Sequence, residues 1–372
     1  MIPDLRIFGI AFAVALLVTG AVAAIARRRG LLDLPEERRT HTVPTPRLGG
    51  VGILCGLAAG WGAIYLLPFW FEDWNHSHFR APMGWEIERT VAAGATAFFL
   101  VGLVDDLNRK GKGVPAWAKL LMQVGAGTVP VALGYVWWGG TWGERDTLSK
   151  SFSDWPWLGL GAATPVMTVL WFVAVVNVVN FMDGIDAIAS SIVLPIFLAS
   201  TWWGWEPTYH IPWCAAAATL AFLVWNRPPA RVFMGDCGSH LLGFLVAVQV
   251  CRPGFGYPEW PFVAAPWPLV AAPLVPAIVD VVEALIHKAR HGIPMSLAHN
   301  DHLYQRLVKA GVPTGLVALR YGLLSVAAIL CVGPLAAAIG ILPATAVGFA
   351  IMGLHLVTAV RRVRGVPRLA RT

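Results

Sequence analysis

Long apolar runs, separated by short polar segments, follow one another along the whole chain. A helix needs about 20 predominantly apolar residues to cross the hydrocarbon core of a bilayer. Eleven runs approach or exceed this length, at 5–26, 49–71, 88–104, 117–138, 164–182, 186–204, 212–226, 238–251, 262–286, 316–340 and 343–360. The seventh and eighth runs are short, and prolines interrupt the ninth. The pattern predicts an all-α polytopic membrane protein with ten or eleven transmembrane helices, folded as a single transmembrane domain over residues 1–372.

The amino-acid composition supports this class. Apolar residues make up 57% of the chain, charged residues make up 13%, and the mean hydropathy is +0.63. Soluble domains typically carry roughly 25% charged residues, so the composition argues against a soluble globular domain. The five cysteines show no spacing typical of a metal site, and we expect most of them to pack as small buried hydrophobes.

Positive charge is distributed unequally between the two sides of the predicted helices. With the N-terminus outside, 21 of the 28 Lys and Arg residues fall in cytoplasmic segments, six fall outside, and Arg320 lies near a helix start. The positive-inside rule therefore predicts an external N-terminus and a cytoplasmic C-terminus. The net charge of +7 suits contact with anionic membrane lipids, and the chain contains no nucleic-acid-binding motif.

The polar segment between the fifth and sixth runs carries amides and carboxylates at a predicted membrane boundary. Asn177, Asn180 and Asp183 recur every three residues, which puts them on one face of a helix. Asp186 adds a second carboxylate, and Gly184 would let a backbone or a ligand approach closely. Such groups are unfavourable near lipid unless they are paired, solvated or bound to a metal. The segment is therefore either a binding site or a polar helix cap.

Two more polar clusters lie on the same predicted side. His41 and Arg47 belong to a loop with two prolines and two glycines, which would either hold phosphate or merely re-enter the membrane. Asp105 and Asp106 follow the third run directly, where one of two repelling acids could act as a base near neutral pH. The alternative for this pair is a solvated helix terminus. Lys119 starts the next predicted helix, so its charge can return to the same surface.

The segment before the eighth run places a carboxylate among glycines. Asp236 lies between Gly235 and Gly238, just before a predicted helix. Backbone N–H groups at a helix start bind phosphate, and an acid beside them binds Mg²⁺. The segment therefore predicts a magnesium–phosphate site.

The last inside segment contains the run from His299 to Arg306. His299 and His302 are three residues apart, so one helical turn would put them on one face. This spacing alone would allow zinc, but no third ligand of zinc type lies nearby in the sequence. Taken together, acids for a metal, bases for phosphate and glycines for close approach predict a phosphoryl-transfer site at one membrane surface.

These residues resemble the polyprenyl-phosphate N-acetylhexosamine-1-phosphate transferase family over nearly the whole chain. The shared motifs are His-x-x-Pro-x-Pro-Arg-x-Gly-Gly from residue 41, Asp-Asp at 105, Asn-x-x-Asn-x-x-Asp-Gly-x-Asp from 177, Phe-Met-Gly-Asp-x-Gly-Ser from 233 and His-x-x-His from 299. Ala187 departs from the family, which usually has glycine there, and we expect the change to be tolerated beside the nucleotide. The triple-histidine motif of the pentapeptide-transferring branch is absent, and the last motif looks like that of the O-antigen-initiating branch.

The resemblance implies a reaction between a UDP-N-acetylhexosamine and undecaprenyl phosphate, with Mg²⁺ as cofactor and Mn²⁺ as a substitute. The products would be undecaprenyl-diphospho-N-acetylhexosamine and UMP, made at the cytoplasmic face of the bacterial cytoplasmic membrane. Asp105 would deprotonate or orient the lipid phosphate, and Asp106 would support it. The phosphate-binding and sugar-binding groups would be Lys119, His299, His302 and Arg306 at the diphosphate or sugar, with His41 and Arg47 in the lipid-phosphate loop.

The same resemblance assigns the metal and nucleotide groups. Asn180 and Asp236 would hold the metal, and Asp183 would organise the metal shell. Gly184 and Asp186 would meet the uracil. Asp280, near the inner end of the ninth run, also resembles the family pattern, but no role is assigned to it. The resemblance leaves the oligomeric state open between a monomer and a homodimer.

Two other classes compete with this interpretation. A CDP-alcohol phosphatidyltransferase is also membrane-bound and Mg²⁺-dependent, but its motif needs Arg where this chain has Ile188. A membrane transporter would place ionisable residues in the middle of its spans, often with repeat symmetry. The acids of this chain cluster at one predicted surface instead.

Overall fold

The computed structural model describes residues 5–33, 43–66, 82–108, 113–133, 164–203, 210–250, 272–294, 302–331, 335, 339 and 341–366, most of which are helical. Eleven helices of 16 residues or more occur in these ranges: α1 (Leu5–Arg28), α2 (Gly49–Leu66), α4 (Pro82–Asn108), α5 (Ala116–Ala132), α7 (Thr164–Met182), α8 (Ile188–Trp203), α9 (His210–Asn226), α10 (Gly235–Val250), α12 (Val275–Arg290), α14 (Thr314–Leu330) and α16 (Ile341–Arg362). A 3-10 turn, η6 (Ala272–Leu274), precedes α12, and the short α13 (Leu303–Lys309) precedes α14.

Each predicted apolar run overlaps one of these helices, but the helix ends differ in ways that matter for the site. The third run was predicted to end at residue 104, whereas α4 continues to Asn108 and includes Asp105 and Asp106 in its last turn. The eighth run was predicted to begin at residue 238, whereas α10 begins at Gly235, which places Asp236 in its first turn. Polar residues therefore extend both helices beyond their apolar runs.

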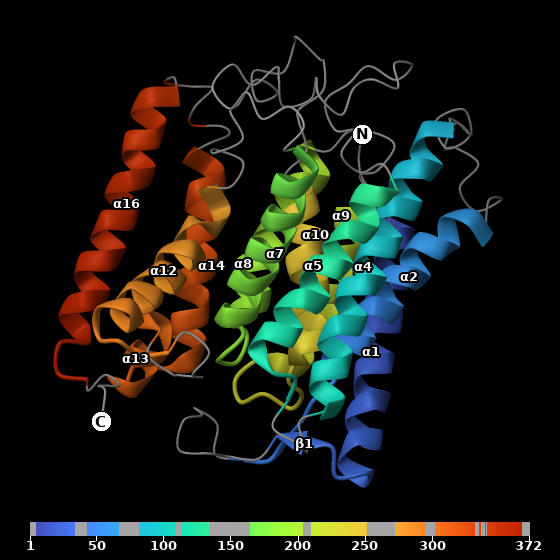
Figure 1. Ribbon diagram of the computed structural model, residues 1–372, viewed down its shortest axis with the longest axis horizontal. Coiled ribbons are helices and arrows are strands. Elements are labelled where there is room, and N and C mark those ends of the chain that lie inside the picture. The colour runs from blue at the N-terminus through green and yellow to red at the C-terminus, as the bar shows by residue number, and fades with distance from the viewer. Residues whose placement is uncertain are drawn as a thin grey trace.

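Within the described ranges, four stretches are long and apolar enough to cross a membrane: Leu5–Arg28, Gly49–Leu66, Glu88–Asn108 and Pro165–Met182. These spans identify an integral membrane protein. The total of ten or eleven spans and the external N-terminus stay predictions. Figure 1 shows the helices lying side by side as a broad bundle, with α1 and α2 at one edge and α16 at the other.

The helix α10 lies at the centre of the bundle. It packs on α4 and α7, and every residue from Asp236 to Gln249 is buried. Phe244 stacks on Phe98 of α4 with ring centroids 5.2 Å apart and meets Phe172 of α7 edge-on at 5.1 Å. This packing fixes the position of the first turn of α10, and with it the position of Asp236.

One feature departs from the all-α prediction. Two short strands, β1 (Leu32–Asp33) and β2 (Thr45–Pro46), form an antiparallel pair at one end of the bundle. The chain continues from β2 into a segment that is bonded to the start of α10. Phe233 N–H donates to the Pro46 carbonyl at 2.8 Å, and Gly50 N–H donates to the Met234 carbonyl at 2.9 Å. The loop is shaped by these bonds, as its prolines and glycines predicted.

Candidate active site

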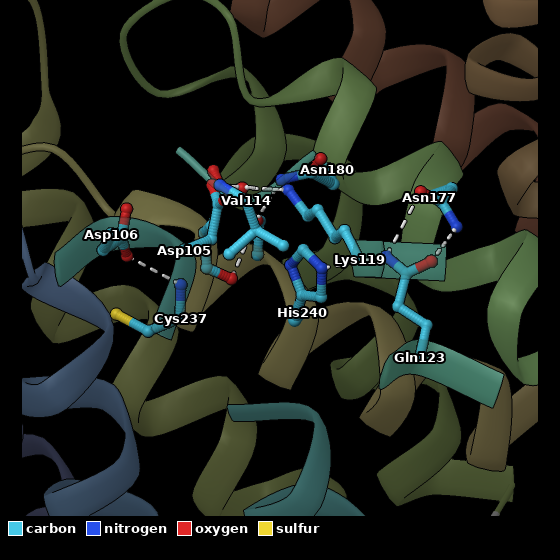
Figure 2. Close-up of polar contacts among 11 residues, drawn as sticks. Asp105, Asp106, Val114, Lys119, Gln123, Asn177, Asn180, Cys237 and His240 are labelled. Carbon is cyan, nitrogen blue, oxygen red and sulfur yellow. Dashed lines mark hydrogen bonds and ion pairs between the residues drawn. The ribbon is translucent and has the colours of Figure 1, made fainter. Parts of the chain in front are cut away.

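The acidic residues of α4 and α10 meet around a single lysine. The Lys119 ammonium, in the first turn of α5, forms an ion pair with Asp236. It also lies 3.6 Å from Oδ2 of Asp105. Asp105 accepts a hydrogen bond from Val114 N–H at 2.9 Å, and its side chain is buried (Figure 2). One cation therefore bridges two carboxylates whose helices lie far apart in the sequence.

The side chain of Asp106, the second acid at the end of α4, contacts the first turn of α10. Cys237 N–H, one of the free donors of the first helical turn, donates to Oδ2 of Asp106 at 2.9 Å (Figure 2). The other carboxylate oxygen, Oδ1, is buried and has no hydrogen-bond partner among the residues that the structure describes. Gly235 has φ +73°, and a Cβ there would lie 2.5 Å from Oδ2 of Asp106. The position of the Asp106 carboxylate thus requires glycine at residue 235. Its Oδ1 is left available to bind a ligand.

The end of α7 contacts the same turn of α10. Asn180 donates from Nδ2 to the Ser239 hydroxyl at 2.8 Å. Asp183 follows α7 and is half-buried. Burial raises the pKa of Asp183 well above its usual value, and the negative charges of Asp236 and Asp106 raise it further. The charge of Asp183 is therefore coupled to those of Asp106 in α4 and Asp236 in α10.

The loop that carries Arg47 lies beside the start of α10. Arg47 forms an ion pair with Asp33 of β1, and both side chains are largely buried. The positive charge of Arg47 lowers the pKa of Asp183 and so partly offsets the rise in pKa that burial causes. Arg47 therefore lies close enough to influence the carboxylates. His41, the other phosphate-binding candidate of this loop, falls outside the described residues.

The turn between α7 and α8 carries the residues expected at the nucleotide. Gly184 is exposed, and a Cβ there would lie 2.1 Å from the Tyr304 hydroxyl, so a larger residue has no room. Asp186 accepts from Ala230 N–H at 2.9 Å. Ala187 has φ +67°, a conformation that favours glycine, and its N–H donates to the Asn226 side chain at 2.8 Å. The departure from the family pattern therefore falls on a strained position.

The helix α13 is anchored by a buried acid. The Asp280 side chain, 1% exposed, accepts from His302 Nδ1 and from the backbone N–H groups of Leu303 and Tyr304, each at 3.0 Å. The Tyr304 hydroxyl in turn donates to the Phe181 carbonyl at the end of α7, at 2.9 Å. Asp280 therefore holds His302 beside the end of α7, which is a role that the sequence did not assign to it.

The other candidates of this segment are placed differently. Arg306 is buried and donates to the Val363 carbonyl beyond α16 at 3.1 Å. His299 falls outside the described residues, so the predicted placement of His299 and His302 on one helix face is not tested. The structure thus brings His302 toward the end of α7 and directs a guanidinium N–H of Arg306 toward α16.

The donor atoms at this end of the bundle suit a hard divalent cation. Asp106, Asp183 and Asp236 supply carboxylate oxygens and Asn180 supplies an amide oxygen, all of the ligand type that Mg²⁺ prefers. The unpartnered Oδ1 of Asp106 also fits a missing ligand. Over the ranges that the structure describes, no three His, Cys, Asp or Glu residues form a ready-made metal cage. Mg²⁺ commonly takes one or two carboxylates together with substrate phosphates, so such a cage is not required.

Several residues at the site were not found from the sequence. Asp33 pairs with Arg47, Ser239 bonds Asn180, and Gln123 bonds Asn177, which had been expected to face the site. Ser239 belongs to a motif that the sequence did show, so its proximity to Asp236 was a usable signal. Asp33 and Gln123 carry no local signal, because their partners come from distant parts of the chain.

Comparison with known proteins identifies the relatives of this chain. Residues 89–253 match the family described as Glycosyl transferase family 4. A phospho-N-acetylmuramoyl-pentapeptide-transferase of Moorella thermoacetica is 31% identical, over 65% of this chain and 73% of the relative. A decaprenyl-phosphate N-acetylglucosaminephosphotransferase of Mycobacterium tuberculosis is 28% identical, over 79% of this chain and 72% of the relative. A probable undecaprenyl-phosphate N-acetylglucosaminyl 1-phosphate transferase of Bacillus subtilis is 26% identical, over 84% and 79%.

These matches define the class: the chain belongs to glycosyl transferase family 4. The matched segment includes the acid pair, Lys119, Asn180 and Asp236, which are the residues that meet at the start of α10. The named relatives come from both the N-acetylglucosamine and the pentapeptide branches. The O-antigen-initiating branch therefore stays a prediction.

Proposed function

We propose that the protein transfers N-acetylhexosamine-1-phosphate from a UDP-sugar to undecaprenyl phosphate, which releases UMP. This would be the first membrane step in making O-antigen or another cell-envelope polysaccharide. The observation that carries the proposal is the ion pair of Lys119 with Asp236, beside Asp105 and the half-satisfied Asp106, at one end of a membrane bundle. Relatives named as polyprenyl-phosphate sugar phosphotransferases support the reaction class.

The chain's own groups divide the work between two anionic substrates. Asp105 removes a proton from the lipid phosphate, whose oxygen then attacks the sugar-bearing phosphorus of the UDP-sugar. The P–O bond to the UMP phosphate breaks, and UMP leaves with the electron pair. Lys119 offsets the negative charge of the diphosphate. Asp105 is placed for this role because its carboxylate lies 3.6 Å from the Lys119 ammonium, which would hold the diphosphate beside it.

Mg²⁺ would be held by Asn180 and Asp236, with Asp183 organising its surroundings and Asp106 supporting the arrangement. When bound, the cation would neutralise charge on the diphosphate and stabilise the charge that develops on the leaving phosphate. Mn²⁺, with the same preference for oxygen ligands, would substitute for it. Gly184 and Asp186 would meet the uracil, and His302 would meet the sugar or the diphosphate. His299 and His41 keep the sugar and lipid-phosphate roles assigned from the sequence.

A radiochemical assay tests the reaction. The purified protein in detergent receives undecaprenyl phosphate, Mg²⁺ and a UDP-sugar labelled in the sugar, and lipid-extractable label and UMP are both measured. Transfer of label with equal release of UMP supports the proposal. Release of free sugar phosphate without lipid product, or uptake of CDP-alcohol substrates instead, contradicts it. Asp236→Asn serves as the inactive control.

The donor preference is tested in the same assay. We propose a UDP-N-acetylhexosamine, with the 6-deoxy sugars included, rather than UDP-N-acetylmuramoyl-pentapeptide. The proposal rests on the segment from His299 to Arg306, which replaces the triple-histidine motif of the pentapeptide branch. Parallel reactions with both donors at equal concentration give the answer. Efficient turnover of the pentapeptide nucleotide would place the protein in the other branch, to which its Moorella thermoacetica relative belongs.

A further inference from the structure

A second polar layer lies one helical turn further from the helix ends than the carboxylate cluster (Figure 2). Gln123 of α5 is at its centre. Its Nε2 lies 2.9 Å from Nε2 of His240 in α10, and its Oε1 accepts from Nδ2 of Asn177 in α7 at 2.8 Å. Gln123 is 1% exposed and His240 is 0% exposed. Three helices that are distant in the sequence are therefore joined by three polar side chains, and those of Gln123 and His240 are buried.

Each member of this layer has a partner in the site on its own helix. Residues three or four positions apart lie on one face of a helix, one above the other. The pairs of site residue and layer residue are Lys119 with Gln123 on α5, Asn180 with Asn177 on α7, and Asp236 with His240 on α10. The layer consequently connects the same three helix faces that present the ion pair and the amide to the site.

The hydrogen bonds of the layer use every donor of the two amides. Nδ2 of Asn177 donates to the Val173 carbonyl at 2.8 Å and to Oε1 of Gln123. Nε2 of Gln123 donates to Oδ1 of Asn177 at 3.3 Å and contacts His240. A backbone carbonyl can only accept, so Val173 fixes the orientation of the Asn177 amide and thereby that of Gln123.

This chain of bonds also determines the state of the histidine. The atom of Gln123 that faces His240 is a donor, so Nε2 of His240 must accept, and the proton of the neutral ring lies on Nδ1. A doubly protonated ring would place two donors against each other. His240 is therefore neutral, one turn below Asp236, and does not compete with Lys119 for that carboxylate.

The arrangement matters because α5 has little other contact with α10. The helix α5 packs on α4 and α7, and it reaches α10 through the long side chains of Lys119 and Gln123. Long side chains have many rotamers, and a buried network that uses every donor of its two amides selects one of them. Without Gln123, the Lys119 ion pair would be the main polar link between these two helices.

We propose that Gln123 is a positioning residue, which with Asn177 and His240 holds α5, α7 and α10 in the register that brings Lys119, Asn180 and Asp236 together. Gln123 touches neither substrate and acts through the residues one turn away. Its kinetic consequence rests on the proposed transferase function. Its structural consequence, the neutral Nδ1-protonated His240, does not.

The first experiment needs no transferase reaction. Protein labelled with ¹⁵N-histidine is studied by NMR in detergent, and His240→Leu identifies the His240 signals among the ten histidines. We expect a neutral ring with the proton on Nδ1 and an accepting Nε2. In Gln123→Met, the Nε2 signal should move because its donor is lost. A ring protonated on Nε2, or a spectrum unaffected by Gln123→Met, overturns the inference even if the protein proves to be a transferase.

The second experiment measures kinetics of matched variants. Gln123→Met should lower kcat/KM by about tenfold to a hundredfold, since small displacements of catalytic groups have effects of this size. The Mg²⁺ concentration needed for half-maximal rate should also rise, by more than a loss of folded protein would explain. Gln249→Met is the control, because Gln249 is a buried glutamine of α10 whose side chain has no hydrogen-bond partner within the described part of the chain. It should stay within about twofold of wild type. Equal activity of Gln123→Met and Gln249→Met overturns the positioning role.

A pair of changes at position 240 covers the case in which Gln123→Met does not fold. His240→Gln retains an acceptor for the Gln123 N–H, whereas His240→Leu removes it. Activity retained in His240→Gln and lost in His240→Leu supports the layer, and equal activity of the two overturns it. If wild type transfers no sugar phosphate from any UDP-sugar, the proposed function fails, and the NMR result still decides the structure of the layer.

Discussion

Asp280 and His302 form a buried pair, with Oδ1 of the acid 3.0 Å from Nδ1 of the imidazole, although 22 residues separate them in the chain. The same carboxylate accepts the Tyr321 hydroxyl of α14 and two backbone N–H groups at the start of α13. A carboxylate that accepts four donors is fully satisfied, and its removal leaves all four unpaired. One acid thus ties α12, α13 and α14 together beside the end of α7.

Replacing this acid should therefore affect stability and donor binding together. We expect Asp280→Ala to lower the free energy of unfolding by about 2–4 kcal/mol, because several buried donors lose their acceptor. Asp280→Asn keeps one acceptor and should lose less. Thermal unfolding in detergent and UDP-sugar affinity are the measurements. A stable Asp280→Ala protein with unchanged affinity would show that α13 does not depend on this anchor.

The two carboxylates assigned to metal and to lipid phosphate should fail in different ways. Asp236→Asn keeps the shape of the side chain and removes its charge, so Mg²⁺ affinity should collapse and activity should fall by roughly 10²-fold or more. Asp105→Asn should also lose turnover but still bind UDP-sugar and Mg²⁺. Calorimetry with a UDP-sugar, with and without Mg²⁺, separates the two. Glu88→Gln, near the opposite end of α4 from Asp105, is the control. Normal Mg²⁺-dependent binding in Asp236→Asn, with its loss in Asp105→Asn, would reverse the assignment.

Gly235 should tolerate no side chain. Alanine at φ +73° costs roughly 1–2 kcal/mol, and its Cβ would lie 2.5 Å from Oδ2 of Asp106. We expect Gly235→Ala to displace the acid and lower activity by about tenfold or more. Gly9→Ala is the matched control, because a Cβ there meets nothing within 4 Å. If both variants have wild-type kcat, the position of Asp106 does not matter for the reaction.

Ala187 offers a test in the opposite direction. Its left-handed backbone costs an alanine roughly 1–2 kcal/mol, which glycine would avoid. Glycine also loosens the unfolded chain by about 0.4–1 kcal/mol, so the free energy of unfolding should rise by between zero and about 1.6 kcal/mol. Ala187→Gly should therefore keep full activity, while the β-branched Ala187→Val should lower the melting temperature. A marked loss of activity in Ala187→Gly would mean that the methyl group itself contacts substrate.

The cytoplasmic position of the site can be tested by labelling. In a cysteine-free background, Arg231→Cys marks the end of the bundle that holds the carboxylates, and Leu66→Cys marks the opposite end; both residues are exposed. An impermeant thiol reagent added outside intact cells should label position 66 and leave position 231 unlabelled until the membrane is opened. Labelling of position 231 from outside would invert the predicted topology.

Hydropathy alone located the helices and gathered the polar clusters on one side, because a bilayer penalises polar groups within its core regardless of the tertiary arrangement. Local chemistry likewise singled out Asp105, Asp106 and Asp236, since acids at apolar boundaries stand out from their neighbours. Gly235 and Gly238 were noted for the same reason. None of these inferences needed to know which helices touch.

Only the tertiary structure decided which groups meet. Lys119 and Asp236 are 117 residues apart, and nothing in either segment names the other as its partner. Asn177 and Asn180 share a helix face, yet the first bonds Gln123 and the second bonds Ser239. Arg306 follows His302 by four residues, but one of its N–H groups bonds the carbonyl of Val363. A helix period fixes which side of its own axis a residue occupies. The neighbour on that side depends on how all the helices pack together, which is a property of the whole bundle.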